Sequence, residues 1–504
     1  MAWLTLLIVL PLIGAVAAWF GGNANARQIG FVASLVTFGV SLAMAIAYVP
    51  NSSAFLQFQE RHDWIPAFGV SYSVGVDGIA LVLILMSTLL VPVVLLAGWH
   101  EMEGADASIR GYVVLTLVLE SMMVGVFAAT DVFLFYVFFE AILIPMYFLI
   151  GRYGGPRRQY ASIKFLLYSL LGGLLMLASL IGLWVQAKQQ LGHGTFDWAA
   201  LSHLQFDATT EKWLWAGFFV AFAVKAPLVP VHTWLPDAAA EATPGSATLM
   251  VGVLDKIGTF GMLRYLLILF PAASLWATPV VIVLALVSIF YGALLAIGQS
   301  DIKRLIAFTS ISHFGFITLG IFAFTSQGQS GATLYMVNHG FSTAALFLVA
   351  GFLISRRGSR FIEDFGGVNK IAPLMAGTFL LAGLSSLALP GMSSFVSEFL
   401  VLTGTFTRYP GEAILATTGI IFAALYILLM YQRTMTGEPS AEVASTVTEI
   451  SKRELAAIAP VIAIIIALGF VPQMLLNVIN PTVDKTMQVV AVADPEPANG
   501  GSNA

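Results

Sequence analysis

The sequence predicts an all-α polytopic membrane protein of about fourteen transmembrane helices, and three observations favour this class. Of the 504 residues, 58% are hydrophobic and only 10% are charged, with a mean hydropathy of +0.89. Apolar stretches of roughly 20 residues, the length that crosses about 30 Å of hydrocarbon, recur along the chain. Ionisable side chains lie deep inside several of these stretches. Together these features exclude an ordinary soluble domain.

The first apolar stretch lacks the positively charged start of a signal peptide, so we interpret it as the first span. The spans are predicted near residues 3–20, 28–49, 79–99, 111–130, 131–150, 162–187, 213–235, 247–270, 277–298, 304–325, 331–354, 374–407, 413–431 and 455–476.

Composition excludes several kinds of chemistry. The chain has no cysteine, which rules out disulfides, thiolate metal sites, iron–sulfur ligation and cysteine nucleophiles. A net charge of -4 without a basic cluster gives no support for a nucleic-acid partner. We find no phosphate-binding glycine loop, metal-ligand spacing or nucleophile constellation, and expect no cofactor in this chain.

Basic residues favour one side of the predicted bundle. Loops on that side carry, among others, Arg110, Arg157, Arg158, Lys303, Arg356, Arg357 and Lys452, whereas the opposite loops carry only Arg61, Lys188, Lys212, Arg264, Arg408 and Lys485. The positive-inside rule places the first set in the cytoplasm and, with an even number of spans, both termini on the opposite face. We expect a multi-pass protein of a bacterial inner membrane, with that face on the periplasmic side. Residues 50–78 on that side are expected to hold a short hairpin, and residues 493–504 are expected to be disordered.

Two spans are predicted to break near the membrane centre. One contains Pro227, Pro230 and Pro236, and the other contains Pro390 and Gly391 a few residues before Glu398. Proline removes a backbone donor and clashes with the preceding turn. Broken helices in corresponding places are typical of inverted repeats around an ion site.

We therefore predict two inverted five-helix repeats, helices 4–8 and 9–13, with broken helices 7 and 12. The predicted division is 1–110 for helices 1–3 with the periplasmic loop, 111–270 and 277–435 for the two repeats, and 436–504 for helix 14 and the tail.

Buried ionisable groups are the candidate functional residues, because a charge in hydrocarbon costs several kcal/mol and normally faces a hydrated interior. Glu140 lies about ten residues from either end of its span, and Lys225 precedes the first break. We predict that they form a proton-exchanging pair, since each group's proton affinity depends on its neighbour's charge. A purely structural carboxyl at Glu140 is the alternative.

Further candidates extend this pair. Lys256 is the next group along, with Asp255 as a neighbour that does not face it directly on a helix. Lys164 lies near enough to cytoplasmic arginines to extend its ammonium to the surface, and Glu120 repeats the Glu140 hypothesis with weaker flanking context.

His313 and His339 are plausible relays, because imidazole can accept and donate a proton at its two nitrogens, although buried histidines are often structural. Glu398 is predicted to be the exit or entry carboxylate. His232 and Asp237 are interpreted as surface residues of a gate or cap.

At these residues the chain resembles the antiporter-like membrane subunits of respiratory complex I, which are related to multisubunit Na⁺/H⁺ antiporters. The resemblance rests on FFEAILIPMYFLIGRYGG, ASIKFLLYSLLGG, VKAPLVPVHTWLPDAAAEATPGSATLM, LDKIGTFGMLR, SDIKRLIAFTSISHFGF and NHGFSTAALFLVAG. A glutamate in SSFVSEFL, where most paralogues carry lysine, is similar to the chain M family, the relatives of mitochondrial subunit 4.

This resemblance implies a proton-translocating, non-redox subunit of NADH:quinone oxidoreductase, with a route through Glu140, Lys225, Lys256 and Glu398. It implies that NADH, FMN, Fe–S clusters and quinone are bound by partner subunits, and that neighbouring L and N chains and lipids surround this one. The alternatives are a subunit of a multisubunit Na⁺/H⁺ antiporter or membrane-bound hydrogenase, and a non-pumping membrane scaffold.

Overall fold

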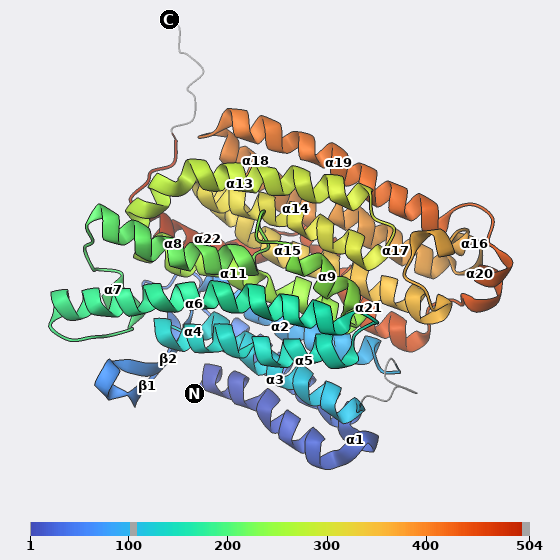
Figure 1. Ribbon diagram of the computed structural model, residues 1–504, viewed down its shortest axis with the longest axis horizontal. Helices are drawn as coiled ribbons and strands as arrows, with labels where there is room; N and C mark the ends of the chain where they lie inside the picture. The colour runs from blue at the N-terminus through green and yellow to red at the C-terminus, as the bar shows by residue number, and fades with distance from the viewer. Residues whose placement is uncertain (1, 101–107, 496–504) are drawn as a thin grey trace, which may run out of the picture.

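The computed structural model describes residues 2–100 and 108–495, which form a bundle of long, roughly parallel or antiparallel helices (Figure 1). The elements of the first half are α1 (Trp3–Ala47), β1 (Gln57–Ile65), η1 (Pro66–Phe68), β2 (Val70–Val76), α2 (Gly78–Ala97), α3 (Ile109–Ala128), α4 (Val132–Ala141), α5 (Leu143–Tyr153), α6 (Arg158–Leu191), α7 (Trp198–Leu201), α8 (Ala208–Lys225) and α9 (Trp234–Glu241).

The second half begins with an irregular helix. Its elements are α10 (Pro244–Leu249), η2 (Met250–Leu254), α11 (Lys256–Gly261), η3 (Met262–Leu266), α12 (Leu267–Leu269), α13 (Pro271–Ile297), α14 (Ile302–Phe322), α15 (Ser326–Arg357), η4 (Ile362–Asp364), α16 (Val368–Ile371), α17 (Pro373–Ser386), α18 (Ser393–Phe406), α19 (Pro410–Met435), α20 (Ala441–Thr446), α21 (Lys452–Phe470) and α22 (Gln473–Val490).

The predicted number of crossings is confirmed. Ten helical segments of the described chain are long and apolar enough to span a membrane, with α4 and α5 acting as one. Gly22 has φ 69° and divides α1 into two crossings, because only glycine adopts this conformation without strain. The pairs α8–α9 and α17–α18 and the irregular segment 244–269 add three more, which gives fourteen.

The predicted helix breaks are also present. The first separates Lys225 from Trp234, where Pro227 and Pro230 cannot donate to a helix, and the second runs from Leu387 to Met392 around Pro390. The first broken helix extends from 208 to 241, beyond the predicted limits of 213 and 235.

Three features were not predicted. The span near 131–150 turns at Ile142, because Pro145 has no amide hydrogen for the Ala141 carbonyl. Segments 250–254 and 262–266 are π-helical, a geometry often found at functional sites. Residues 473–490 form α22, in a region for which the sequence predicted only a helix 14 and a tail.

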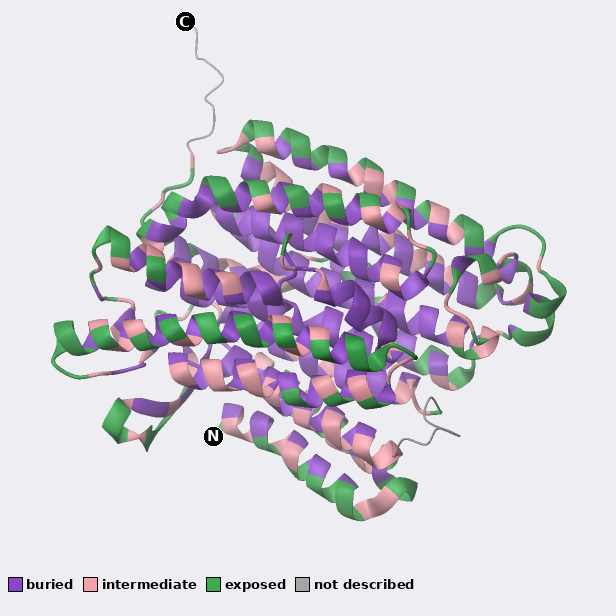
Figure 2. Cartoon of the chain, in the orientation of Figure 1, coloured by how far each residue is buried: buried purple, intermediate pink, exposed green. Residues whose placement is uncertain are grey.

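Buried helices occupy the middle of the bundle. Every residue of α14 except Arg304 is buried, and α15 is buried from Gly328 to Leu353. By contrast α1, α6, α13 and α19 have exposed stripes on their outer faces (Figure 2). Charged groups on α14 and α15 are therefore enclosed by protein, whereas the outer helices present their aliphatic side chains to the surroundings.

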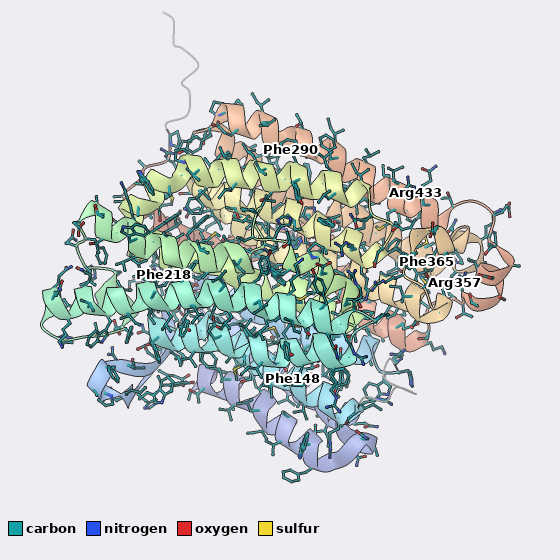
Figure 3. All side chains as sticks on the ribbon, in the orientation of Figure 1. Phe148, Phe218, Phe290, Arg357, Phe365 and Arg433 are labelled. Atoms are coloured by element: carbon teal, nitrogen blue, oxygen red, sulfur yellow. The ribbon has the colours of Figure 1, made fainter. Side chains whose placement is uncertain are left out.

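Both described ends of the chain lie at one end of the bundle. Leu4 N donates to Glu60 Oε1 of the β1–β2 hairpin over 2.8 Å, and Lys485 Nζ donates to the carbonyls of Ser52 and Ala54 over 2.8 Å. The antiparallel hairpin confirms the expectation for residues 50–78. Arg357 and Arg433 lie at the opposite end (Figure 3). Of the tail predicted to be disordered, residues 496–504 lie outside the described residues.

Candidate functional site

Lys256 lies at the centre of a chain of buried polar groups. Its ammonium donates to the Val251 carbonyl in the π-helical turn and lies 2.7 Å from Nδ1 of His339 on α15. Both side chains are fully buried. The π-helical turn thus supplies a backbone acceptor to Lys256 and directs it toward a histidine.

His339 leads to His313 on α14. The two imidazole rings are edge to face with centroids 5.1 Å apart, and Nε2 of His339 has no hydrogen-bond partner. His313 Nε2 lies 3.3 Å from the hydroxyl of Tyr426 on α19. Neutral imidazole can accept a proton at one nitrogen and release one from the other, so two adjacent rings form a chemically competent relay.

Glu398 lies beyond the histidines. The hydroxyl of Tyr335 donates to Glu398 Oε2 over 2.7 Å, and the Tyr335 ring is 5.8 Å from that of His313. Tyr335 and His339 are four residues apart on α15 and therefore share one face of that helix. One helix face thus connects the histidine pair with Glu398.

Glu140 and Lys225 lie on the other side of Lys256. Glu140 is the penultimate residue of α4, and its Oε1 is buried without a hydrogen bond against Gly173 of α6. Lys225, the last residue of α8, is 1% exposed. Its ammonium has no hydrogen-bond partner in the described chain and lies 4.6 Å from the Phe139 ring centroid. The two described groups make no ion pair within 4.0 Å, although their charges act on each other.

Asp255 is a buried carboxylate that interacts electrostatically with two lysines, Lys225 and Lys256. Both of its carboxylate oxygens are buried and have no hydrogen bond to any described residue. The expectation that Asp255 does not face Lys256 directly agrees with the contacts of Lys256 described above. An unpaired buried carboxylate is costly, so it favours positive charge on either neighbouring lysine.

Lys164 belongs to a separate ion-pair cluster. This cluster lies at the same end of the bundle as Arg357 and Arg433. Its ammonium is 2.7 Å from Asp237 Oδ2, while Arg304 Nη1 is 2.5 Å and Arg157 Nη2 is 3.7 Å from Oδ1 of the same carboxylate. Asp237 is 6% exposed and His232 is 3% exposed, so their interpretation as surface residues was wrong. The break turns α9 back into the protein, which buries both.

Glu120 on α3 is not brought to this chain of groups. It is fully buried, and neither carboxylate oxygen has a hydrogen-bond partner among the described residues. Within the part of the chain that the structure describes, no charged side chain forms an ion pair with Glu120. Within the described residues, no group of three or more histidine, aspartate or glutamate side chains is placed to hold a metal ion.

Sequence reasoning did not select three residues that contact these groups. Tyr335 and Tyr426 were not selected, because a tyrosine in an apolar helix is indistinguishable from a packing residue until its hydroxyl is placed. Gly173 was missed because its role is to leave room for the Glu140 carboxyl. The only available signal was the i, i+4 spacing of Tyr335 and His339.

Fold and site together define a class: a polytopic membrane protein with broken helices and a line of ionisable side chains inside the bundle, typical of antiporter-like ion translocators. The comparisons agree. Residues 129–423 match the family model described as NADH:quinone oxidoreductase/Mrp antiporter, TM.

Relatives that align over almost the whole chain identify the family more closely. NADH-quinone oxidoreductase subunit M of Mycobacterium tuberculosis (strain ATCC 25618 / H37Rv) is 49% identical, covering 98% of this chain and 96% of the relative. NADH-ubiquinone oxidoreductase chain 4 of Arabidopsis thaliana is 36% identical, covering 96% of each. A chain of respiratory complex I from Thermus thermophilus with bound NADH superposes with a TM-score of 0.88 at 30% identity, covering 97% of this chain and 99% of that one. The chain belongs to the subunit M/chain 4 family, the antiporter-like membrane subunits of complex I.

Proposed function

We propose that this proton-translocating subunit of NADH:quinone oxidoreductase moves protons along one route, Glu140, Lys225, Lys256, His339, His313 and Glu398. Tyr335 and Tyr426 supply hydroxyls between His313 and Glu398. The observation that carries the proposal is the contact of Lys256 with His339, which joins the lysine half of the route to the histidine half.

Electrostatics gives the route its order. Moving one elementary charge against 100 mV costs about 2.3 kcal/mol, so a pump has to change proton affinities in sequence and not simply open a pore. Lys225 and Glu140 have charges that act on each other without a direct bond. A shorter distance between the Glu140 carboxylate and the Lys225 ammonium favours the charged forms of both groups. A longer distance leaves Lys225 to interact with Asp255 and Lys256.

Lys164 has a different proposed role from the route residues. Its ion pair with Asp237 fixes the far end of the first broken helix beside α6 and α14. We propose that Lys164 adjusts the position of α9 relative to Lys225, and that Glu120 stays outside the route.

Further proposals concern the complex to which this chain belongs, its membrane and its internal repeats. The chain is a multi-pass membrane component of complex I, and we propose that L and N chains flank it and that NADH, FMN, Fe–S clusters and quinone are bound by other subunits. We propose a bacterial inner membrane with both termini in the periplasm. The divisions 111–270 and 277–435 are proposed as inverted repeats, supported by one broken helix in each.

The test is NADH-driven proton uptake by the intact complex in proteoliposomes carrying Lys225→Ala. We expect proton uptake to fall strongly in a normally assembled complex, because the route loses the Lys225 ammonium between Glu140 and Lys256. Lys188→Ala, an exposed lysine near the end of α6, is the matched control and should pump normally. Unaltered uptake in an assembled Lys225→Ala complex would contradict the route. Sodium-dependent transport by vesicles in the absence of NADH would instead favour a Na⁺/H⁺ antiporter subunit.

A further inference from the structure

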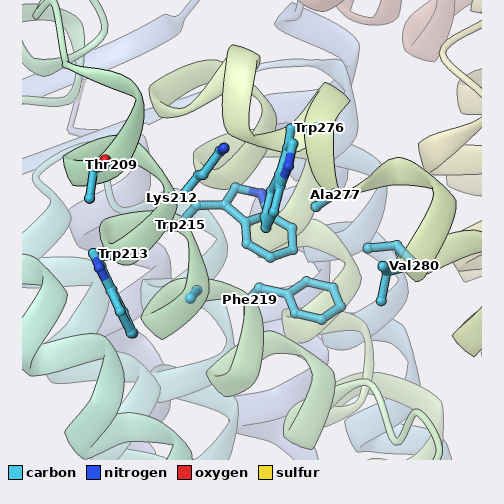
Figure 4. Close-up of a pocket in the computed structure, with 10 residues that line it drawn as sticks. Thr209, Lys212, Trp213, Trp215, Phe219, Trp276, Ala277 and Val280 are labelled. Carbon is cyan, nitrogen blue, oxygen red and sulfur yellow. The ribbon is translucent and has the colours of Figure 1, made fainter.

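An open groove lies between the beginnings of α8 and α13, away from the proton route. Its volume is about 570 Å³, and Figure 4 shows Lys212 beside Trp276, Phe219 and Val280 further along the groove, and Trp213 apart from Trp276. Lys212 is thirteen residues before Lys225 on one helix, or about 20 Å at 1.5 Å per residue. Because Lys225 lies in the middle of its span, the groove begins near the membrane surface.

The mouth of the groove is cationic and aromatic. The Lys212 ammonium is 4.4 Å from the Trp276 ring centroid, and the indoles of Trp213 and Trp276 are 75% and 60% exposed. Tryptophan concentrates at the level of lipid headgroups, where an apolar ring also meets polar groups. A lysine there extends its ammonium toward phosphate while its stem stays on apolar surface.

Neighbouring carboxylates do not neutralise this mouth. Glu211 is buried and accepts from the Ala273 amide at the start of α13 over 3.0 Å, and Asp207 caps α8 by accepting from Thr209 and Thr210. Both acids are thus engaged with helix N-termini, which stabilise negative charge. Lys212 is left as the cation that faces the groove.

The groove walls are fixed before any ligand arrives. Trp215 Nε1 donates to Ser274 Oγ over 3.0 Å, which joins α8 to α13, and the Ser274 hydroxyl donates to the Leu266 carbonyl. Below this contact, exposed aliphatic side chains continue along the outer face of α13 at Val280, Val283 and Val287. This stripe provides a path for an acyl chain.

We propose that this groove is a binding site for an anionic phospholipid. Its phosphate is bound by Lys212 beside Trp276, and one acyl chain lies on Phe219 and along the exposed stripe of α13. Charge complementarity at the mouth and the uninterrupted aliphatic face below it favour a lipid over a helix from a neighbouring protein. The lipid fills the junction between α8, which ends at Lys225, and α13.

The test uses the intact complex in phosphatidylcholine nanodiscs with a trace of phosphatidylglycerol that carries a photoreactive diazirine in its acyl chain. Labelled peptides are mapped by mass spectrometry and compared with those from the matching phosphatidylcholine probe. We expect phosphatidylglycerol to label segments 209–219 and 276–281 about fivefold more, since one lysine contributes about 1 kcal/mol near an anionic lipid surface.

Variants separate the groove from the general membrane surface. Lys212→Gln should bring the ratio of the two probes to about one, while NADH-driven proton uptake shows that the complex is assembled. Lys188→Gln is the matched control, because Lys188 also lies over a tryptophan, 5.3 Å from the Trp184 ring centroid, but outside the groove. The proposal is overturned if Lys212→Gln leaves the ratio unchanged, if neither segment is labelled, or if both segments cross-link to a neighbouring subunit instead.

Discussion

At the scale of single residues, Tyr335 tests whether hydroxyl groups belong to the route. Its hydroxyl is the hydrogen-bond donor to Glu398 Oε2. Tyr335→Phe keeps the ring and removes this bond, and a hydrogen bond to a charged group is worth about 1.5–3 kcal/mol. We expect NADH-driven proton uptake to fall about tenfold or more. Tyr431→Phe is the control, because Tyr431 is a half-buried tyrosine on a different helix, α19. Equal proton uptake in both variants would remove Tyr335 from the route.

Gly173 tests the space around Glu140. A Cβ at this position would lie 1.6 Å from Glu140 Oε1, so the carboxyl has to move. Gly173→Ala should therefore reduce proton uptake as Glu140→Gln does, even though alanine favours a helix over glycine by about 1 kcal/mol. Gly377→Ala on α17, where a Cβ meets nothing within 4 Å, should pump normally. Normal pumping by both glycine variants would show that the position of the carboxyl does not matter.

The sequence identified most of the charged residues at this scale, but not their connections. Buried charge is visible in a hydropathy pattern because an ionisable residue inside an apolar span is rare. The contact of Lys256 with His339 depends on a π-helical turn, and no residue type specifies that geometry. Tyr335 likewise contributes through the direction of one hydroxyl.

At the scale of helices, the Asp237 cluster is expected to hold the first broken helix in place. Asp237→Asn leaves Lys164, Arg304 and Arg157 without their shared carboxylate. Since Asp237 is buried and its partners are partly exposed, we expect a loss of about 1–3 kcal/mol, between the values for exposed and buried ion pairs.

Thermal unfolding of the assembled complex measures this loss, together with proton uptake at a temperature where both forms are folded. Glu438→Gln breaks the exposed pair with Lys370 and should change stability by less than about 1 kcal/mol. If Asp237→Asn is no less stable than Glu438→Gln, the cluster does not position α9.

The helix breaks show which element boundaries a sequence can predict. Pro227, Pro230 and Pro390 predicted two breaks correctly, because a missing amide hydrogen acts locally. Pro145 has the same effect on Ala141, yet the run around it is apolar throughout and was interpreted as one span. The π-helical segments and α22 depend on packing against other helices, which composition does not encode.

At the scale of the whole molecule, the proposed route would cross from α4 through α8, α11, α15 and α14 to α18, so both predicted repeats would contribute. The fourteen crossings followed from apolar length alone. The relative placement of the two halves did not, because it depends on the burial of α14 and α15 among the other helices of the bundle. A single continuous route is therefore tested by changing residues at both of its ends, and not by one substitution.

If protons follow one route, removing a charge at either end should stop the same flow. We expect Glu140→Gln and Glu398→Gln each to reduce the protons moved per NADH oxidised, and the double variant to be no worse than the more severe single one, because residues acting as a unit are not additive. Glu120→Gln is the control and should pump normally, because Glu120 is a buried glutamate without a charged partner among the described residues. The measurement is the proton-to-NADH ratio in proteoliposomes. Two separate routes would instead give losses that add in the double variant, and that result would contradict a single line of proton transfer from α4 to α18.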